Sequence, residues 1–227
     1  MHIPDGIFPI EQAIVYLVVA VIFLAYSLYR VGKTLEDKHI PLLGVLAAGI
    51  FAAQMFNFPV PFGSSGHLVG TALATAYVGP AGAIVIIASV LLVQAFFGDG
   101  GITAYGVNLL NMGVIGGLVS WLVIGLVLNV LKENKNARTI AVGIAGFVAT
   151  IVEAFVASLE LILAGLQPAF LIISWMVGLH IIIGIGEAAI SMSIIAYTTK
   201  VRPDLLTMKH FELVPGAITT QDNEVKL

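Results

Sequence analysis

Long blocks of apolar residues alternate with short polar or glycine- and proline-rich stretches along most of this chain. An α-helix rises about 1.5 Å per residue, so about 20 apolar residues cross the roughly 30 Å hydrocarbon core of a membrane. No region shows the short alternating strands of an outer-membrane barrel. The pattern predicts an all-α integral membrane protein, with a single transmembrane domain over residues 1–200 and a polar, cytoplasmic tail over 201–227.

Seven helical segments are predicted from this pattern. The third, 67–78, would measure only about 18 Å by helix rise, which is too short to cross a membrane unaided. We expect it to lie partly inside the bundle, behind a Pro/Gly/Ser-rich loop over 57–66 that dips in from the surface, and to end at the turn 79–82. The seven segments are 7–29, 41–56, 67–78, 83–97, 102–131, 139–166 and 169–199.

The basic residues predict how these segments are oriented. All ten Lys and Arg residues lie in 30–39, in 132–138 or beyond Thr199. With seven crossings those three parts share one side of the membrane, and the loops on the other side contain no basic residue. Because cytoplasmic loops are enriched in Lys and Arg, the amino terminus is predicted outside and the carboxyl terminus in the cytoplasm. The expected location is a bacterial or archaeal cell (inner) membrane.

Composition supports the membrane class and narrows the chemistry. The chain is 59% hydrophobic and 10% charged, against about 25% charged in soluble proteins. It has no cysteine, which excludes disulfides, thiolate metal sites and cysteine nucleophiles. The first basic residue, Arg30, lies behind a full span, so we expect no cleavable signal peptide and a retained Met1 at the mature terminus. No organic cofactor and no nucleic-acid partner are expected.

The polar residues predicted on the outer side include two of the five histidines, His2 and His67. A free amine at Met1, the amide nitrogen of His2 and Nδ1 of His2 can chelate one metal ion through fused rings. The imidazole of His67 would complete a square of four nitrogens. Such a set favours Ni(II) or Cu(II) over zinc or magnesium, with Co(II) as a second choice, and geometry alone does not exclude copper.

Other polar residues could support that site through hydrogen bonds to the ligands. Asp5 could accept one from the free ring nitrogen of a ligand histidine. Ordinary turn and cap chemistry explains these residues at least as well. The further candidates are Asn57, Ser64, Ser65 and Asp99. Of the remaining histidines, His39 and His210 are expected to be solvated, and His180 to be a satisfied core residue.

Three stretches of this sequence resemble the substrate-specific component (CbiM/NikM) of cobalt and nickel energy-coupling-factor transporters. They are Met1-His2-Ile3-Pro4-Asp5-Gly6, Phe58-Pro59-Val60-Pro61 with Ser65-Gly66-His67-Leu68, and Gly98-Asp99-Gly100-Gly101-Ile102-Thr103-Ala104. The resemblance runs in order from residue 1 to about 200, and the opening hexapeptide is its most specific part.

The resemblance implies a high-affinity metal-capture subunit that is not itself an enzyme. Met1, His2 and His67 would hold the metal, with the nickel branch favoured. A transmembrane coupling subunit, cytoplasmic ATPase subunits and a small accessory membrane component would be its partners. The sequence contains no GxxxxGK[ST] phosphate-binding loop, so ATP hydrolysis is expected in a partner. We also expect the chain to lack a fused second component.

Two alternatives follow from other residues. Glu153, Glu160 and Glu187 lie in the last two spans, where carboxylates are functional candidates, so an intramembrane metal-dependent enzyme is conceivable. No HExxH or Ser/Lys pattern accompanies them, and we favour neutral or paired carboxylates that hold helices together. A stand-alone metal carrier would instead need a continuous polar path across the membrane.

Overall fold

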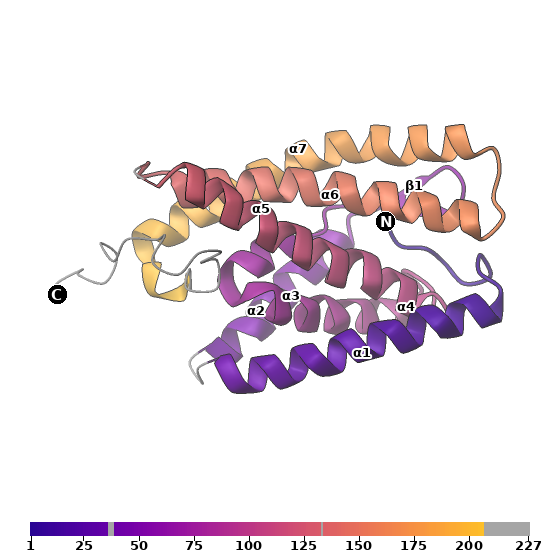
Figure 1. Ribbon diagram of the computed structural model, residues 1–227, viewed down its shortest axis with the longest axis horizontal. Coiled ribbons are helices and arrows are strands. Elements are labelled where there is room, and N and C mark those ends of the chain that lie inside the picture. Colours follow the sequence, from indigo (N-terminus) through magenta and orange to yellow (C-terminus); the bar gives the residue numbers. More distant parts are fainter. Residues whose placement is uncertain (36–38, 133, 207–227) are drawn as a thin grey trace.

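Helices make up most of the structure, a computed structural model that describes residues 1–35, 39–132 and 134–206. They form an elongated bundle whose long members run side by side (Figure 1). The helices are α1 Ile10–Thr34, α2 Ile40–Gln54, α3 Thr71–Phe96, α4 Tyr105–Asn108, α5 Gly116–Val130, α6 Ala137–Leu163 and α7 Ala169–Val201. A π-helical segment, Leu109–Ile115, joins α4 to α5, and a 3-10 turn, Pro203–Leu205, follows α7.

The helical membrane class is confirmed, but the count of seven crossings is not. Among the described residues, five helical stretches are long and apolar enough to cross a membrane, and α2 is a shorter apolar helix. The predicted segments 67–78 and 83–97 correspond to the two halves of α3, which begins at Thr71 and is kinked at Gly79. The five stretches are Ile10–Thr34, Thr71–Phe96, Tyr105–Val130, Ala137–Leu163 and Ala169–Val201.

A break inside α3 lies at the turn predicted at 79–82. Gly79 has φ 72° and ψ 175°, outside the helical region, and it precedes Pro80, which has no N–H to donate. Both ends of α3 nevertheless lie beside the start of the chain, because His67 contacts Met1 and Gln94 contacts His2. A straight helix of 26 residues would separate its ends by about 39 Å, so α3 folds back at this break.

The connections between helices separate by charge. The α1–α2 and α5–α6 connections and the end of α7 lie at one end of the bundle, and the α6–α7 connection lies at the other (Figure 1). The first group carries the basic residues of the described chain, although α1 continues to Thr34 and so includes Arg30 and Lys33. Which end faces the cytoplasm stays a prediction. The proposed tail lies mostly outside the described residues, beyond Leu206.

The predicted loop over 57–66 contains a small antiparallel hairpin. Strand β1, Phe58–Val60, pairs with β2, Ser64–Gly66, and Phe58 lies opposite Gly66. A Cβ on Gly66 would lie 2.6 Å from the Phe58 ring, so only glycine fits under that ring. The hairpin leads directly into His67 and the start of α3.

The contact between α4 and α1 depends on Gly106. A Cβ at this position would lie 2.4 Å from the backbone nitrogen of Leu17, and backbone cannot yield as a side-chain end can. We expect Gly106→Ala to push α1 outward and to destabilise the protein by about 1–3 kcal/mol, seen as a lower unfolding midpoint in detergent. Gly44→Ala in α2 is the matched control, because no atom lies within 4 Å of its added Cβ. An unchanged midpoint for Gly106→Ala would contradict this close packing.

Candidate metal centre

The first three residues are buried inside the bundle. Met1 and Ile3 are fully buried and His2 is 3% exposed, and the side chains of Met1 and Ile3 belong to the hydrophobic core. Asn108 holds this segment by its backbone, accepting a hydrogen bond from Ile3 N at 2.9 Å and donating one to Ile3 O at 3.0 Å. Gly101 N donates a second bond to Ile3 O, at 3.2 Å. Both hydrogen-bonding groups of the Ile3 backbone therefore have partners inside the bundle.

The amine of Met1 lies between the β2 strand and His67. It donates to the carbonyl of Ser65 and lies 2.7 Å from His67 Nε2. Burial lowers the pKa of this amine from 8.0 to about 4, and the nearby carboxyl groups of Glu153 and Asp99 oppose the shift only in part. At neutral pH the amine is therefore uncharged, with a lone pair available to a metal ion.

His67 is held in the tautomer that a metal ligand needs. Its Nδ1 lies 2.8 Å from the carbonyl oxygen of Leu68, which can only accept, so Nδ1 carries the proton. The lone pair is then on Nε2, which faces the Met1 amine. Burial, together with the nearby amine and the His2 ring, holds the pKa of His67 well below its usual value. The imidazole is thus neutral.

The loop that carries His67 is anchored to two helices. Glu187 in α7 accepts hydrogen bonds from Val69 N at 2.9 Å and Gly70 N at 2.7 Å. Gln54, the last residue of α2, donates to Val69 O at 2.7 Å. These bonds satisfy the backbone where it enters the bundle, and they fix the position of the His67 ring.

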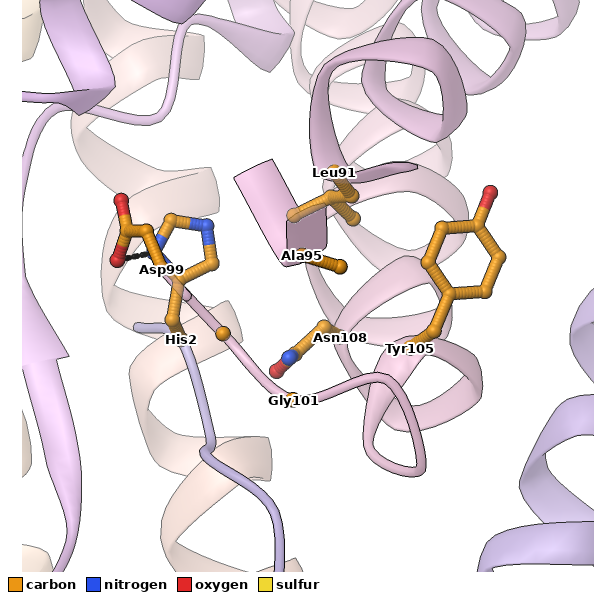
Figure 2. Close-up of a pocket in the computed structure, with 8 residues that line it drawn as sticks. His2, Leu91, Ala95, Asp99, Gly101, Tyr105 and Asn108 are labelled. Atoms are coloured by element: carbon orange, nitrogen blue, oxygen red, sulfur yellow. Dashed lines mark ion pairs between the residues drawn. The ribbon is translucent and has the colours of Figure 1, made fainter. Parts of the chain in front are cut away.

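The His2 ring stacks on that of His67, with centroids 4.3 Å apart and planes inclined by 22°. Its Nε2 lies 3.1 Å from Gln94 Oε1, and its Nδ1 lies 3.2 Å from Asp99 Oδ1. Figure 2 shows this last contact beside Asn108 and the Gly101 backbone. Burial lowers the pKa of His2, with Asp99 acting in the opposite direction. Both imidazoles and the amine are accordingly neutral nitrogen donors within one small region.

One distance corresponds closely to a square nitrogen site. Nitrogen ligands lie about 2.0 Å from such metal ions, so adjacent corners of a square are about 2.8 Å apart. Met1 N and His67 Nε2 are 2.7 Å apart. Among the described residues no group of three or more His, Cys, Asp or Glu side chains could hold a metal. Any site here therefore depends on nitrogens of the main chain.

The comparisons with known proteins identify the family. The family model described as the cobalt uptake substrate-specific transmembrane region matches residues 2–205. The chain belongs to the CbiM family.

Relatives in this family are transport proteins. The chain is 32% identical over 233 residues to the fused nickel transport protein NikMN of Rhodobacter capsulatus, covering 95% of this chain and 66% of that protein. It is 31% identical to the cobalt transport protein CbiM of Geobacter sulfurreducens, covering 91% of this chain and 61% of that one. The crystal structure of a transition metal transporter superposes with a TM-score of 0.82 at 31% identity, covering 94% of this chain and 98% of that chain.

Membership in the CbiM family makes the chain a multi-pass membrane protein and a substrate-specific component of cobalt or nickel uptake. In this CbiM protein the structure brings together the three residues predicted as ligands, Met1, His2 and His67. The orientation of His2 differs from the predicted chelate, because its Nδ1 faces Asp99.

The predicted supporting residues have several roles. Asp5, for which a histidine ring or ordinary turn chemistry was expected, accepts hydrogen bonds from Ile102 N, Thr103 N and the Thr103 hydroxyl. It thereby fastens the turn after Gly6 to the loop over 98–104. Asn57 donates to Asp99 Oδ2 at 2.8 Å, and Ser65 Oγ accepts from His2 N at 3.1 Å. Ser64 Oγ is buried without a hydrogen-bond partner among the described residues.

Two residues that hold the centre were missed as such. Asn108 and Gln94 are polar positions inside long apolar runs, and that exception in the pattern is the signal that points to them. Gly101 is also required, because a Cβ there would lie 2.4 Å from Asp5 N.

The remaining histidines and carboxylates also depart from expectation in part. His39 was expected to be solvated, yet it is 2% exposed just before α2, although the next residue, Ile40, is 58% exposed. His180 is buried, with Nδ1 bonded to Met176 O and Nε2 without a partner among the described residues. His210 lies outside the described residues. Glu160 pairs with Asn111 and Glu187 with the His67 loop, as expected of helix-locking carboxylates.

Replacing Asn108 tests whether docking of the first residues matters for metal affinity. Asn108→Leu keeps the volume, leaves Ile3 N without a hydrogen-bond partner and leaves Ile3 O with only its bond from Gly101 N. We expect a loss of about 2 kcal/mol from docking, hence about 30-fold weaker nickel binding by calorimetry. Asn111→Leu, which loses the bond to Glu160 instead, should lower the unfolding midpoint and spare nickel affinity. Equal effects of the two variants on affinity would contradict a specific role for Asn108.

Proposed function

We propose that this chain captures Ni(II), or secondarily Co(II), on the outer side of the membrane and delivers it to an ATP-driven importer of the energy-coupling-factor type. The proposal rests chiefly on the burial of a neutral amine at Met1 directly against His67 Nε2. Hydrogen bonds to Ser65 O and His67 Nε2 offset part of the cost of burying the amine, and its lone pair stays available for a further function. A transition-metal cargo supplies that function in a protein of this family.

The proposed ligands are four nitrogens: the Met1 amine, the deprotonated His2 amide, His2 Nδ1 and His67 Nε2. Two of them already face each other across the distance of a square edge. The His2 ring must turn Nδ1 away from Asp99 and toward the amine to close the chelate. Ser65 Oγ, which accepts from His2 N, would lose that hydrogen bond as the amide gives up its proton. Metal binding therefore replaces the His2–Asp99 contact and the Ser65–His2 N hydrogen bond with coordination bonds.

Nickel is favoured over cobalt by the nature of these donors. A planar set of nitrogens suits Ni(II), whereas zinc prefers a tetrahedron and magnesium prefers oxygen ligands. The relatives include both nickel and cobalt transport proteins, so the two ions are the natural pair to compare. We expect nickel to bind more tightly than cobalt when both are titrated under the same conditions.

The proposed partners are a transmembrane coupling subunit, cytoplasmic ATPase subunits and a small accessory membrane component. They are supported by the resemblance of the three stretches that begin at Met1, Phe58 and Gly98 to energy-coupling-factor substrate components. An intramembrane enzyme has less support, since the named relatives are transport proteins and two of the three span carboxylates have structural partners. A stand-alone carrier is the alternative that transport measurements must separate.

Nickel uptake measured with and without the partners tests the proposal. The purified chain should bind nickel one to one, and liposomes containing it alone should show no nickel flux. Cells that lack their own nickel importer should accumulate nickel only when the chain, the coupling subunit and the ATPase subunits are all present. Flux through the chain alone would favour the carrier, and failure of the purified chain to bind nickel or cobalt would overturn the capture function.

A further inference from the structure

Glu153 in α6 is a buried carboxylate that the packing leaves unsatisfied. The residue is 1% exposed, and neither side-chain oxygen has a hydrogen-bond partner among the described residues. The other two carboxylates in the last spans differ, since Glu187 accepts two backbone hydrogen bonds and Glu160 accepts one from Asn111. An ionised carboxylate without partners is costly inside a membrane protein, so its charge must be matched by a proton or a cation.

The position of Glu153 places it at the loop that carries His67. Its Oε1 rests on Gly116 of α5, where a Cβ would lie 1.9 Å from that oxygen and 3.2 Å from Thr71 Cγ2. Thr71 is the first residue of α3, directly after that loop. Glu187 binds the N–H groups of Val69 and Gly70 in the same loop. Two carboxylates therefore flank the loop, and one of them is left free.

A charge on Glu153 interacts electrostatically with the Met1 amine in the proposed metal site. Among charged groups it has the largest influence on the Met1 amine, ahead of Asp99. In return, the titratable groups that act on Glu153 are Glu187, from α7, and the Met1 amine, from the terminal segment. The elements α3 and α5 face it with Thr71 and Gly116, which do not titrate.

We propose that Glu153 is the counter-charge of the captured metal ion. It carries a proton before the metal binds and releases that proton to water as the dication arrives. An M²⁺ ion held by a deprotonated amide and neutral nitrogens keeps one positive charge, which the Glu153 carboxylate then cancels. The inference rests on the proposed function. It makes Glu153 a positioning residue that acts through charge, without being a metal ligand.

Nickel binding by Glu153→Gln tests the inference, with Glu160→Gln as the matched control two turns further along the same helix. Calorimetry in buffers of different ionisation enthalpy gives the number of protons released per nickel. We expect E153Q to release one proton fewer than the wild type and to bind about 10- to 100-fold more weakly at neutral pH. Each unit of pH decrease should then cost the wild type about tenfold more affinity than it costs E153Q. E160Q should match the wild type in both respects.

A second measurement does not depend on affinity. Infrared difference spectra of nickel binding should show loss of a protonated carboxyl C=O band in the wild type and in E160Q, and no such loss in E153Q. The unfolding midpoint of E153Q without metal should be unchanged or higher, because the substitution removes an unpartnered acid. Equal proton release by wild type and E153Q, or a wild-type spectrum without the carboxyl band, overturns the counter-charge. Wild-type protein that binds no nickel overturns the proposed function instead.

Discussion

One extra residue before Met1 is expected to abolish tight nickel binding. The extension converts the Met1 amine into an amide, which has no basic lone pair, and so removes one of the four proposed ligands. It also has no room, because Met1 is fully buried against Ser65 and His67. Losing a supporting contact to a metal ligand already costs about 10- to 100-fold in affinity, so losing a ligand and the docked segment together should cost more than about 100-fold.

Calorimetry of paired proteins provides the measurement. The same residue added after Leu227 is the control, and intact mass should establish that the native terminus starts at Met1 without acetylation. Nickel affinity retained by the extended protein would show that the amine is not a ligand. Protein with an amino-terminal tag should fail the same test and should regain binding once a protease restores Met1 as the first residue.

The second large effect is expected from His67→Ala. This change removes the ligand that faces the amine and leaves three nitrogens from the first two residues. We expect nickel affinity to fall by more than about 100-fold and the remaining weak complex to lose its planar spectrum. Imidazole added to the solution should restore part of the binding, because it can enter the space left by the ring.

His39→Ala is the matched control for His67→Ala. His39 is also nearly fully buried, but it lies at the start of α2 and its ring nitrogens contact no described polar group. Both substitutions should lower the unfolding midpoint through the cavity that they leave. Only His67→Ala should change nickel affinity. A planar nickel spectrum retained by His67→Ala would remove His67 from the ligand set.

The sequence predicted the helical class and the proximity of His2 to His67 because both depend on simple regularities. Apolar block length predicts membrane helices, and the charge distribution brings distant polar loops to one end. The doubling back of α3 was predicted only as a turn, at the point where Gly79 and Pro80 break the helix.

Side-chain partners inside the bundle could not be read from the pattern. The pairing of Asn108 with Ile3 requires the terminal segment to enter the core, and the sequence places polar residues without saying what they face. The partner of Asp5 stayed open for the same reason: a carboxylate near a turn suits either a histidine or backbone N–H groups, and the packing of the Gly101 loop decides between them. The difference between Glu187, which accepts two backbone hydrogen bonds, and Glu153, which has no hydrogen-bond partner among the described residues, likewise appears only in three dimensions.

The proposed square of four nitrogens is tested most simply by titrating the purified protein with nickel while its absorption spectrum and magnetism are recorded. A square of four nitrogens gives a yellow, diamagnetic complex that saturates at one nickel per chain. We expect this diamagnetic complex for the native terminus, and we expect it to be lost when a residue is added before Met1. A paramagnetic six-coordinate complex, or saturation at a different ratio, would contradict the proposed centre.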